Sequence, residues 1–258
     1  MVSLRTWTLR LGMSGLAGAA LLAGATAQAQ SVVLRSTGPS AASYPQGKKL
    51  PANAKVTLRA GDKLTVLDKA GSRVLSGPGS FTLNGAVARD GGSSPRVGTV
   101  LAGGGVRART GAVRGAPGLA AVAQPTPNGP DSVWYIDVSK GGAYCVTEPA
   151  SLVLWRPNRA EEATGKLGVL GTKPVELVWK KGNPLKQWPV DKVPVVDSTR
   201  YTFSDPLGPN VTITLHLVGP VPPADELSVA SLLADRGCKA QLDVLANAAT
   251  ASGSAAGG

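Results

Sequence analysis

Apolar and polar side chains alternate most regularly between residues 56 and 83. Three short runs carry an apolar side chain at every second position, and Gly, Asp and Pro residues separate the runs. Because successive side chains of a strand point to opposite faces, this pattern predicts a three-stranded meander with one buried face. The apolar residues that follow Ser31 predict a further strand, so we expect residues 31–85 to form a small β domain.

A β domain of about 55 residues buries little apolar surface of its own. The meander contains a single aromatic residue, Phe81. We therefore expect this domain to pack against the second domain of the chain or against a partner, and Phe81 is a candidate contact residue.

Seven further β-rich runs lie between residues 131 and 220, separated by Gly, Pro and Asn clusters. Their number and spacing predict a β-sandwich of the immunoglobulin-like (Ig-like) type. The last run alternates most clearly, with Val211, Ile213 and Leu215 on one side. The expected fold class is therefore mainly β, with a small N-terminal meander, a C-terminal sandwich and a short helical tail.

The helical tail is predicted for residues 221–248. Asp225 is placed as an N-cap, Glu226 lies in the first turn, and Gly237 is expected to end the first helix. A second helical stretch follows, with Leu242 and Leu245 facing inward. The low-complexity residues 249–258 are expected to be disordered.

Residues 86–130 are rich in Gly, Pro, Ala and Arg and poor in large apolar side chains, which predicts a flexible linker. Within it, Val and Arg alternate around Arg107 and Arg109. This patch could be a short strand or a basic segment that becomes ordered on a partner. Arg107 and Arg109 are therefore candidate partner contacts.

The first 29 residues have the features of a secretory signal: Arg5 and Arg10, then a run of small and apolar residues, then two overlapping A-x-A cleavage patterns. Cleavage is expected after Ala27 or Ala29, which predicts a periplasmic or secreted bacterial protein. No transmembrane segment is expected in the mature chain, because the apolar run is too short to span a membrane.

Removing the signal lowers the formal net charge from +11 to +9, because it carries two of the 27 basic residues and none of the 16 acidic ones. The basic residues are dispersed, and no dense basic run is interleaved with aromatic residues as in nucleic-acid-binding proteins. We therefore expect an envelope protein or an anionic envelope polymer as the partner, and no nucleic acid.

Cys145 and Cys238 are the two cysteines of the chain. In an exported protein they are most simply one disulfide. The bond would join the helical tail to the first edge of the sandwich and would remove about 4 to 5 kcal/mol of unfolded-state entropy.

Several short motifs of the meander resemble the FecR-like β domains of bacterial envelope proteins. They are Leu58-Arg59-Ala60-Gly61-Asp62-Lys63-Leu64, then Leu67-Asp68, Gly71 and Leu75-Ser76-Gly77-Pro78-Gly79-Ser80-Phe81. In those modules a glycine-led strand pair precedes a "GPGS" turn. FecR regulators also have a cytoplasmic segment and a membrane helix, which we do not expect here. The resemblance therefore implies a small envelope β module that contacts another component.

No catalytic constellation is evident in the sequence: no G-x-S-x-G, no S-x-x-K and no metal-ligand spacing occurs. We therefore expect no cofactor, no metal and no enzymatic activity, and we predict an exported scaffold or regulatory adaptor that binds other envelope proteins. The alternative is a glycan- or peptidoglycan-binding module. In that case Trp188 and Trp155 would form an exposed aromatic platform, with Lys180, Lys181 or Arg156 beside Trp188 in a groove; otherwise the tryptophans are core or lid residues.

Overall fold

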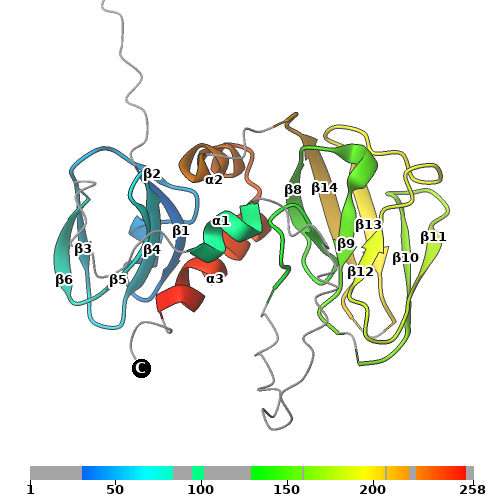
Figure 1. Cartoon of the computed structure of the whole chain (residues 1–258), viewed down its shortest axis with the longest axis horizontal. Coiled ribbons are helices and arrows are strands. Elements are labelled where there is room, and N and C mark those ends of the chain that lie inside the picture. Colours follow the sequence, from blue (N-terminus) through cyan, green and yellow to red (C-terminus); the bar gives the residue numbers. More distant parts are fainter. Residues whose placement is uncertain are drawn as a thin grey trace, which may run out of the picture.

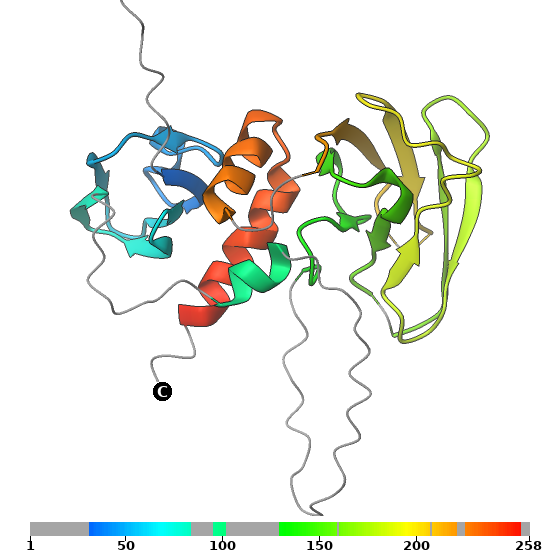
Figure 2. The ribbon, with the colours of Figure 1, turned by 45° about the horizontal axis from the view of Figure 1, so that its top comes forward.

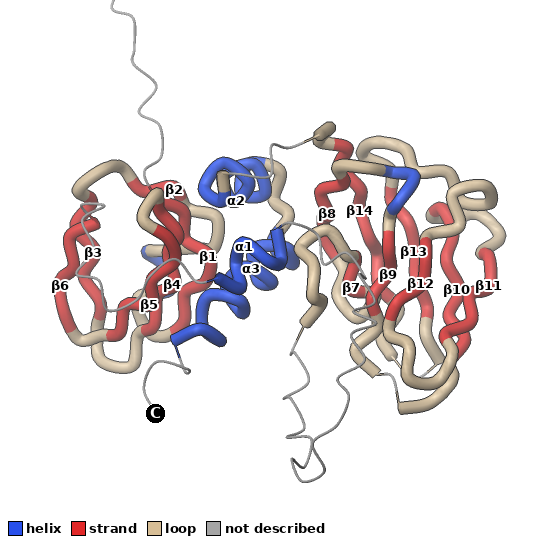
Figure 3. Tube along the Cα trace, viewed as in Figure 1, coloured by secondary structure: helices blue, strands red, loops and turns tan. Residues whose placement is uncertain are grey.

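The computed structural model describes residues 31–83, 95–101, 129–158, 160–206, 208–220 and 225–253. The predicted signal sequence lies outside these residues. The chain is mainly β, as expected, and its strands form two units that flank a group of helices (Figures 1 and 3). We call residues 31–83 the N-terminal β unit, residues 129–220 the C-terminal β unit, and helices α1 to α3 the helical layer.

The N-terminal β unit contains two sheets. The larger has the order β2-β1-β4-β5, with antiparallel neighbours, and the smaller pairs β3 with β6. The strands are β1 (Ser31–Thr37), β2 (Lys49–Leu50), β3 (Ala54–Leu58), β4 (Lys63–Asp68), β5 (Gly71–Ser76) and β6 (Gly79–Leu83), and a 3-10 turn, Ala41–Ser43, follows β1. Val33, Val56, Leu64, Val66 and Leu83 are buried in one core.

The prediction of a three-stranded meander is therefore wrong, because residues 54–83 form four strands in two sheets. Two turns that meet redirect the chain between the sheets. The Asp62 carboxylate accepts a hydrogen bond from the Ser40 amide at 2.9 Å, and the Gly77 amide donates to the Asp62 carbonyl at 2.9 Å. A Cβ at Gly77 would lie 2.0 Å from the Arg59 carbonyl oxygen, so this close approach requires glycine.

The C-terminal β unit has a five-stranded sheet of order β11-β10-β13-β14-β8 and a three-stranded sheet of order β12-β9-β7. The pairs β14–β8 and β7–β9 are parallel and the others antiparallel. The strands are β7 (Ile136–Asp137), β8 (Gly142–Val146), β9 (Val153–Trp155), β10 (Ala163–Val169), β11 (Val175–Trp179), β12 (Leu185–Gln187), β13 (Arg200–Ser204) and β14 (Val211–Leu217), with a 3-10 turn at Pro149–Ser151.

Both sheets of this unit contribute to one aromatic core, in which Trp179, Trp188, Tyr144, Tyr201 and Phe203 are almost fully buried. Trp179 packs edge-to-face on Phe203, with ring centroids 5.8 Å apart. The first of the seven expected runs, residues 132–138, is a strand only at Ile136–Asp137, and β12 lies outside all seven runs. The Ig-like character of the unit stays a prediction.

The helical layer consists of α1 (Pro95–Leu101), α2 (Glu226–Asp235) and α3 (Lys239–Gly253). Figure 2 shows α1 and α2 lying against the longer α3. The linker expected at residues 86–130 is wrong for α1, because Val97, Val100 and Leu101 are buried at the i, i+3, i+4 spacing of an apolar helix face. The rest of that segment, with Arg107 and Arg109, lies outside the described residues except for Gly129 and Pro130, which are buried.

The two C-terminal helices agree with the predicted caps. The Asp225 side chain accepts hydrogen bonds from the Leu227 and Ser228 amides at 3.2 Å, and Gly237 has a φ of 67°. Leu242 and Leu245 are fully buried. The helix α3 continues to Gly253, so the disorder expected from residue 249 is wrong for its first residues; residues 254–258 lie outside the described part.

A single apolar cluster links both β units through the helical layer. Val32, Leu34 and Leu67 enter it from the N-terminal unit, and Val133 and Cys145 enter it from the C-terminal unit. Between them lie buried side chains of all three helices: Val97, Val100, Leu101, Leu227, Val229, Ala230, Leu233, Leu242, Val244, Leu245, Ala246 and Ala249. The helices are therefore a shared core and not a tail of one domain.

The predicted disulfide is present. Cys145 and Cys238 are bonded, with their Cα atoms 5.9 Å apart. Cys145 lies on β8, an edge strand of the five-stranded sheet, and Cys238 directly precedes α3. No helix of the described residues is long and apolar enough to cross a membrane.

Candidate functional site

The two tryptophans are buried, so their interpretation as core residues is confirmed and the alternative, an exposed aromatic platform, is wrong for both. Trp188 is 1 % exposed and Trp155 is 8 % exposed. The Trp188 amide donates to the Leu152 carbonyl at 2.8 Å, which turns the indole into the core. There its Nε1 donates to the Val193 carbonyl at 2.7 Å and its ring packs edge-to-face on Tyr201. Both polar and apolar parts of the side chain are thus satisfied inside the unit.

The remaining predicted contact residues do not form one site. Lys180 and Lys181 are exposed directly after β11, the edge strand farthest from β8 in the five-stranded sheet. Phe81 is half-buried on β6, where it packs against the core of the N-terminal β unit. The lysines and Phe81 belong to opposite ends of the molecule (Figure 1).

A cavity of about 210 Å³ opens among the loops of the C-terminal β unit. It is lined by residues that follow β7, β9 and β13, namely Val138, Ser139, Arg156, Pro157, Asn158, Asp205, Gly208 and Pro209. We call it the Arg156 cavity. Its wall is partly apolar, and it contains a buried charged pair.

The pair consists of Arg156 and Asp205. Arg156 Nε donates to Asp205 Oδ2 at 2.9 Å, and Nη1 donates to the Asn158 carbonyl at 2.9 Å. The side chains are 4 % and 12 % exposed. A guanidinium has five N–H donors. Nη2 has no acceptor among the described residues, and it is not fully enclosed by the protein. The cavity is thus lined by an arginine with donors to spare.

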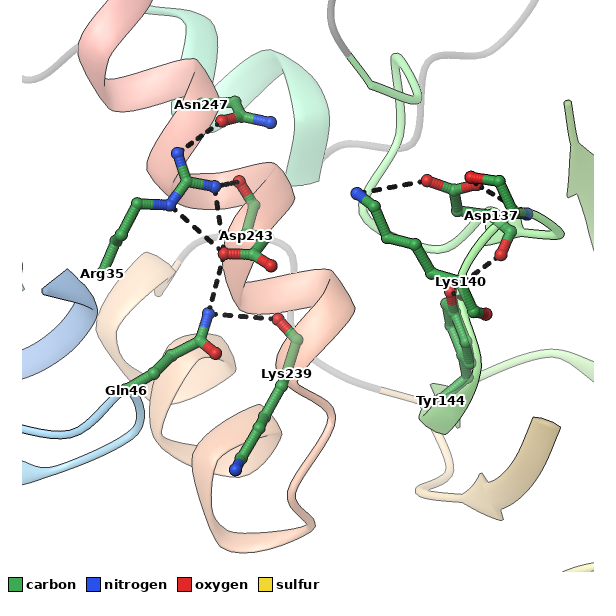
Figure 4. A network of polar contacts seen from close by, with 9 residues as sticks. Arg35, Gln46, Asp137, Lys140, Tyr144, Lys239, Asp243 and Asn247 are labelled. Atoms are coloured by element: carbon green, nitrogen blue, oxygen red, sulfur yellow. Dashed lines mark hydrogen bonds and ion pairs between the residues drawn. The ribbon is translucent and has the colours of Figure 1, made fainter. Parts of the chain in front are cut away.

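The part of the wall formed by Val138 and Ser139 is held by a turn around Asp137. Asp137 Oδ1 accepts hydrogen bonds from the Ser139 amide at 3.0 Å and from the Ser139 hydroxyl at 2.5 Å. Lys140 Nζ lies 3.2 Å from Asp137 Oδ2, and the Tyr144 hydroxyl donates to the Asp137 carbonyl at 3.0 Å (Figure 4). Burial, reinforced by the Asp137 charge, raises the pKa of Tyr144 far above its usual range, so the hydroxyl keeps its proton.

A second polar network fixes the N-terminal β unit to α3. Arg35 on β1 donates to the Asp243 carboxylate at 2.9 Å and to the Asn247 side chain at 2.7 Å, and Gln46 Nε2 donates to the same carboxylate at 3.0 Å (Figure 4). On the other side of α3, the buried Gln241 accepts from the Cys145 amide at 2.7 Å and donates to the Cys145 and Val133 carbonyls at 2.9 Å. Gln241 thus caps the free edge of β8.

Comparison with protein-family models, curated proteins and solved structures finds no match for this chain. The FecR-like resemblance therefore stays a prediction. None of the described residues forms a group of three or more His, Cys, Asp or Glu side chains that could hold a metal ion.

Arg156 was expected only as a possible neighbour of an exposed Trp188, and neither its pairing with Asp205 nor the bridging role of Gln241 was predicted from the sequence. The two members of the ion pair are separated by 49 positions, and no local pattern pairs them. What the Arg156 cavity offers chemically is a buried donor beside a buried carboxylate, with apolar walls.

Proposed function

We propose that this protein is an exported, non-catalytic adaptor of the bacterial envelope that binds other envelope proteins. The observation that carries the proposal is the shared helical layer, which holds two separate β units in one orientation. Val32, Leu34 and Leu67 on one side and Val133 and Cys145 on the other pack into the same cluster. Such an arrangement presents two distinct β surfaces at a constant separation, which is what an adaptor requires.

Three further features support the envelope as the location. The first 29 residues predict a secretory signal, the cysteines are paired, and the motifs between Leu58 and Phe81 resemble FecR-like modules. A disulfide is maintained in an oxidising compartment such as the bacterial periplasm, so the compartment and the bond are consistent with each other.

The partner surface that we propose is the exposed edge of β11. Val178 on this strand is 40 % exposed, and Lys180 and Lys181 follow it with exposed side chains. Charges on an exposed rim steer association and suppress wrong partners. An acidic or mixed-charge protein surface is the complement of this edge.

The test is capture of partners from envelope extract by the mature protein, with Lys180→Glu/Lys181→Glu as the variant. The matched control is Lys55→Glu/Lys63→Glu, which makes the same charge change at two exposed lysines of the N-terminal β unit. We expect the first variant to lose a defined set of proteins that the control retains. Equal loss in both variants would mean that retention follows net charge alone and would contradict the assigned surface. No retention above a basic control protein would contradict the adaptor function.

The Arg156 cavity favours a second candidate, a glycan-binding module. The expected tryptophan platform is not its basis, because Trp155 and Trp188 are buried. Sedimentation of the mature protein with purified peptidoglycan tests this candidate: depletion from the supernatant supports it, and full recovery in the supernatant contradicts it.

A further inference from the structure

The Arg156 cavity contains a charged pair that packing alone does not require. Burying two ions costs several kcal/mol before their attraction offsets it, and apolar residues of similar volume often serve stability equally well. Here the pair lies in the wall of an open cavity, and Arg156 retains an Nη2 group with no acceptor among the described residues. A side chain this deeply buried, with a donor left over at a cavity, is typical of a built polar site.

Among the described residues, the charged side chains at the cavity form two ion pairs. Arg156 is paired with Asp205 at 2.9 Å, and Lys140 with Asp137 at 3.2 Å. A carboxylate or phosphate ligand would place a further negative charge beside Asp205, and a cation would lie beside Arg156. Each would be an uncompensated charge in a partly desolvated site. The charge balance therefore favours a neutral ligand with hydrogen-bonding groups.

The cavity offers both donors and acceptors. Asn158 uses its Oδ1 to accept from the Ala160 amide at 3.0 Å, so its Nδ2 can donate, as can Arg156 Nη2. Because the Ser139 hydroxyl gives its proton to Asp137, its oxygen can accept. Hydroxyl groups donate and accept hydrogen bonds at the same time. They therefore complement this combination of donors and acceptors better than a ligand group that can only donate or only accept.

The apolar walls and the size add a shape requirement. Val138, Pro157 and Pro209 provide apolar surface between the polar groups. At about 210 Å³ the cavity is smaller than the ~300 Å³ at which drug-sized pockets begin. A single ring with C–H faces and peripheral hydroxyls fits this description, with any continuation of the ligand outside the cavity.

We propose that the Arg156 cavity binds one uncharged sugar ring, with Arg156, Asn158 and Ser139 as hydrogen-bonding residues. This inference rests on the second candidate function, glycan binding. Asp205 holds the guanidinium in place and is a positioning residue.

The test is titration of the isotope-labelled mature protein, followed by amide resonances in NMR spectra. The probes are glucose, galactose, mannose and N-acetylglucosamine at high millimolar concentration. We expect at least one sugar to produce saturable shifts in the residues that line the cavity. Sodium acetate and glucuronic acid serve as anionic probes. Absence of shifts with all four neutral sugars, or stronger shifts of the same amides with the anions, would overturn the proposal.

The variant Arg156→Met/Asp205→Leu removes the charged pair while preserving volume and apolar packing. Its matched control is Arg73→Met/Asp68→Leu, which removes a largely buried Arg–Asp ion pair of the N-terminal β unit. We expect the first variant to bind the sugar about tenfold more weakly or worse, because a site built to hydrogen-bond hydroxyls loses its donors. The control should bind normally. Unchanged affinity in the cavity variant would overturn the proposal.

The peptidoglycan sedimentation assay separates failure of this inference from failure of glycan binding itself. If the mature protein sediments with peptidoglycan but no sugar shifts the cavity residues, glycan binding stands and the assigned cavity is wrong. If the protein neither sediments nor responds to the sugars, both are wrong.

Discussion

Gln241→Ala should be among the most destabilising single changes in the helical layer. Gln241 is 1 % exposed, and its side-chain amide satisfies three backbone groups, the Cys145 amide and the Cys145 and Val133 carbonyls. Alanine leaves all three without a partner, and a buried unsatisfied group costs ~1–3 kcal/mol. Allowing for water that enters the vacated space, we expect a loss of about 3 kcal/mol in the free energy of unfolding. For a chain of this size that corresponds to a melting temperature lower by about 6–12 °C.

Asn247→Ala is the matched control, because it removes an amide from the same helix. Asn247 is half-buried, and its side-chain oxygen accepts a hydrogen bond from Arg35 at 2.7 Å. Its loss should cost about 1 kcal/mol or less, since water can replace the missing partner. Both variants are compared with the unmodified mature protein by thermal and urea unfolding with the disulfide intact. If Gln241→Ala costs no more than Asn247→Ala, Gln241 does not join α3 to the C-terminal β unit as described.

Three further predictions concern the N-terminal β unit and the start of α2. Residues 31–83 expressed alone should show no cooperative melt, because Val32, Leu34 and Leu67 would become exposed at ~1.5–3 kcal/mol each; a cooperative transition above about 60 °C would contradict this. Phe81→Ala should cost about 2 kcal/mol in chemical denaturation, roughly half the value for a fully buried ring, whereas the exposed neighbour Thr82→Ala should stay within about 0.5 kcal/mol. Hydrogen bonds from Ser228, and next from Leu227, hold the pKa of Asp225 below its usual range. The ionised side chain therefore contributes fully to the free energy of unfolding above the ordinary carboxylate pKa, and this contribution is lost as the pH falls through the lowered pKa. Asp225→Asn should therefore flatten the acid end of the stability profile while keeping the cap, and Asp225→Ala should lose about 1 kcal/mol at neutral pH; an unchanged acid profile in Asp225→Asn would refute the assignment.

The elements that were predicted correctly are those whose signals are local. Asp225 and Gly237 mark the ends of α2 because capping depends on residues within one turn. The alternation of Ile213 and Leu215 identified β14 because one face of that strand is buried. The disulfide followed from there being two cysteines in a chain with a predicted export signal.

Elements that depend on distant partners were predicted less well. Four strands in two sheets replaced the meander because the Asp62 and Gly77 turns meet, and no local pattern reveals that contact. The helix α1 is short and lies in a Gly-rich context that masked the spacing of Val97, Val100 and Leu101. A signal for the helical layer was present in β1, where Val32, Val33 and Leu34 do not alternate because both faces of the strand are buried.

The candidate site also depends on contacts between residues that are far apart in the sequence. Exposure of Trp188 could not be inferred from its place in a Gln-Trp-Pro sequence, because the loop folds back and its indole finds an acceptor at Val193. Arg156 follows β9 and Asp205 follows β13, so their pairing depends on how the two sheets stack. The strands that precede these residues were predicted from the sequence, but the cavity between the loops was not.

Differential scanning calorimetry of the mature protein tests the central claim most directly, that the helical layer makes the two β units one cooperative structure. Because Val32, Leu67, Val133 and Cys145 share one apolar cluster with α1 to α3, neither unit should unfold without exposing the core of the other. We predict a single transition with equal calorimetric and van't Hoff enthalpies. Two separate transitions, or a calorimetric enthalpy well above the van't Hoff value, would show that the β units unfold independently and would contradict the account.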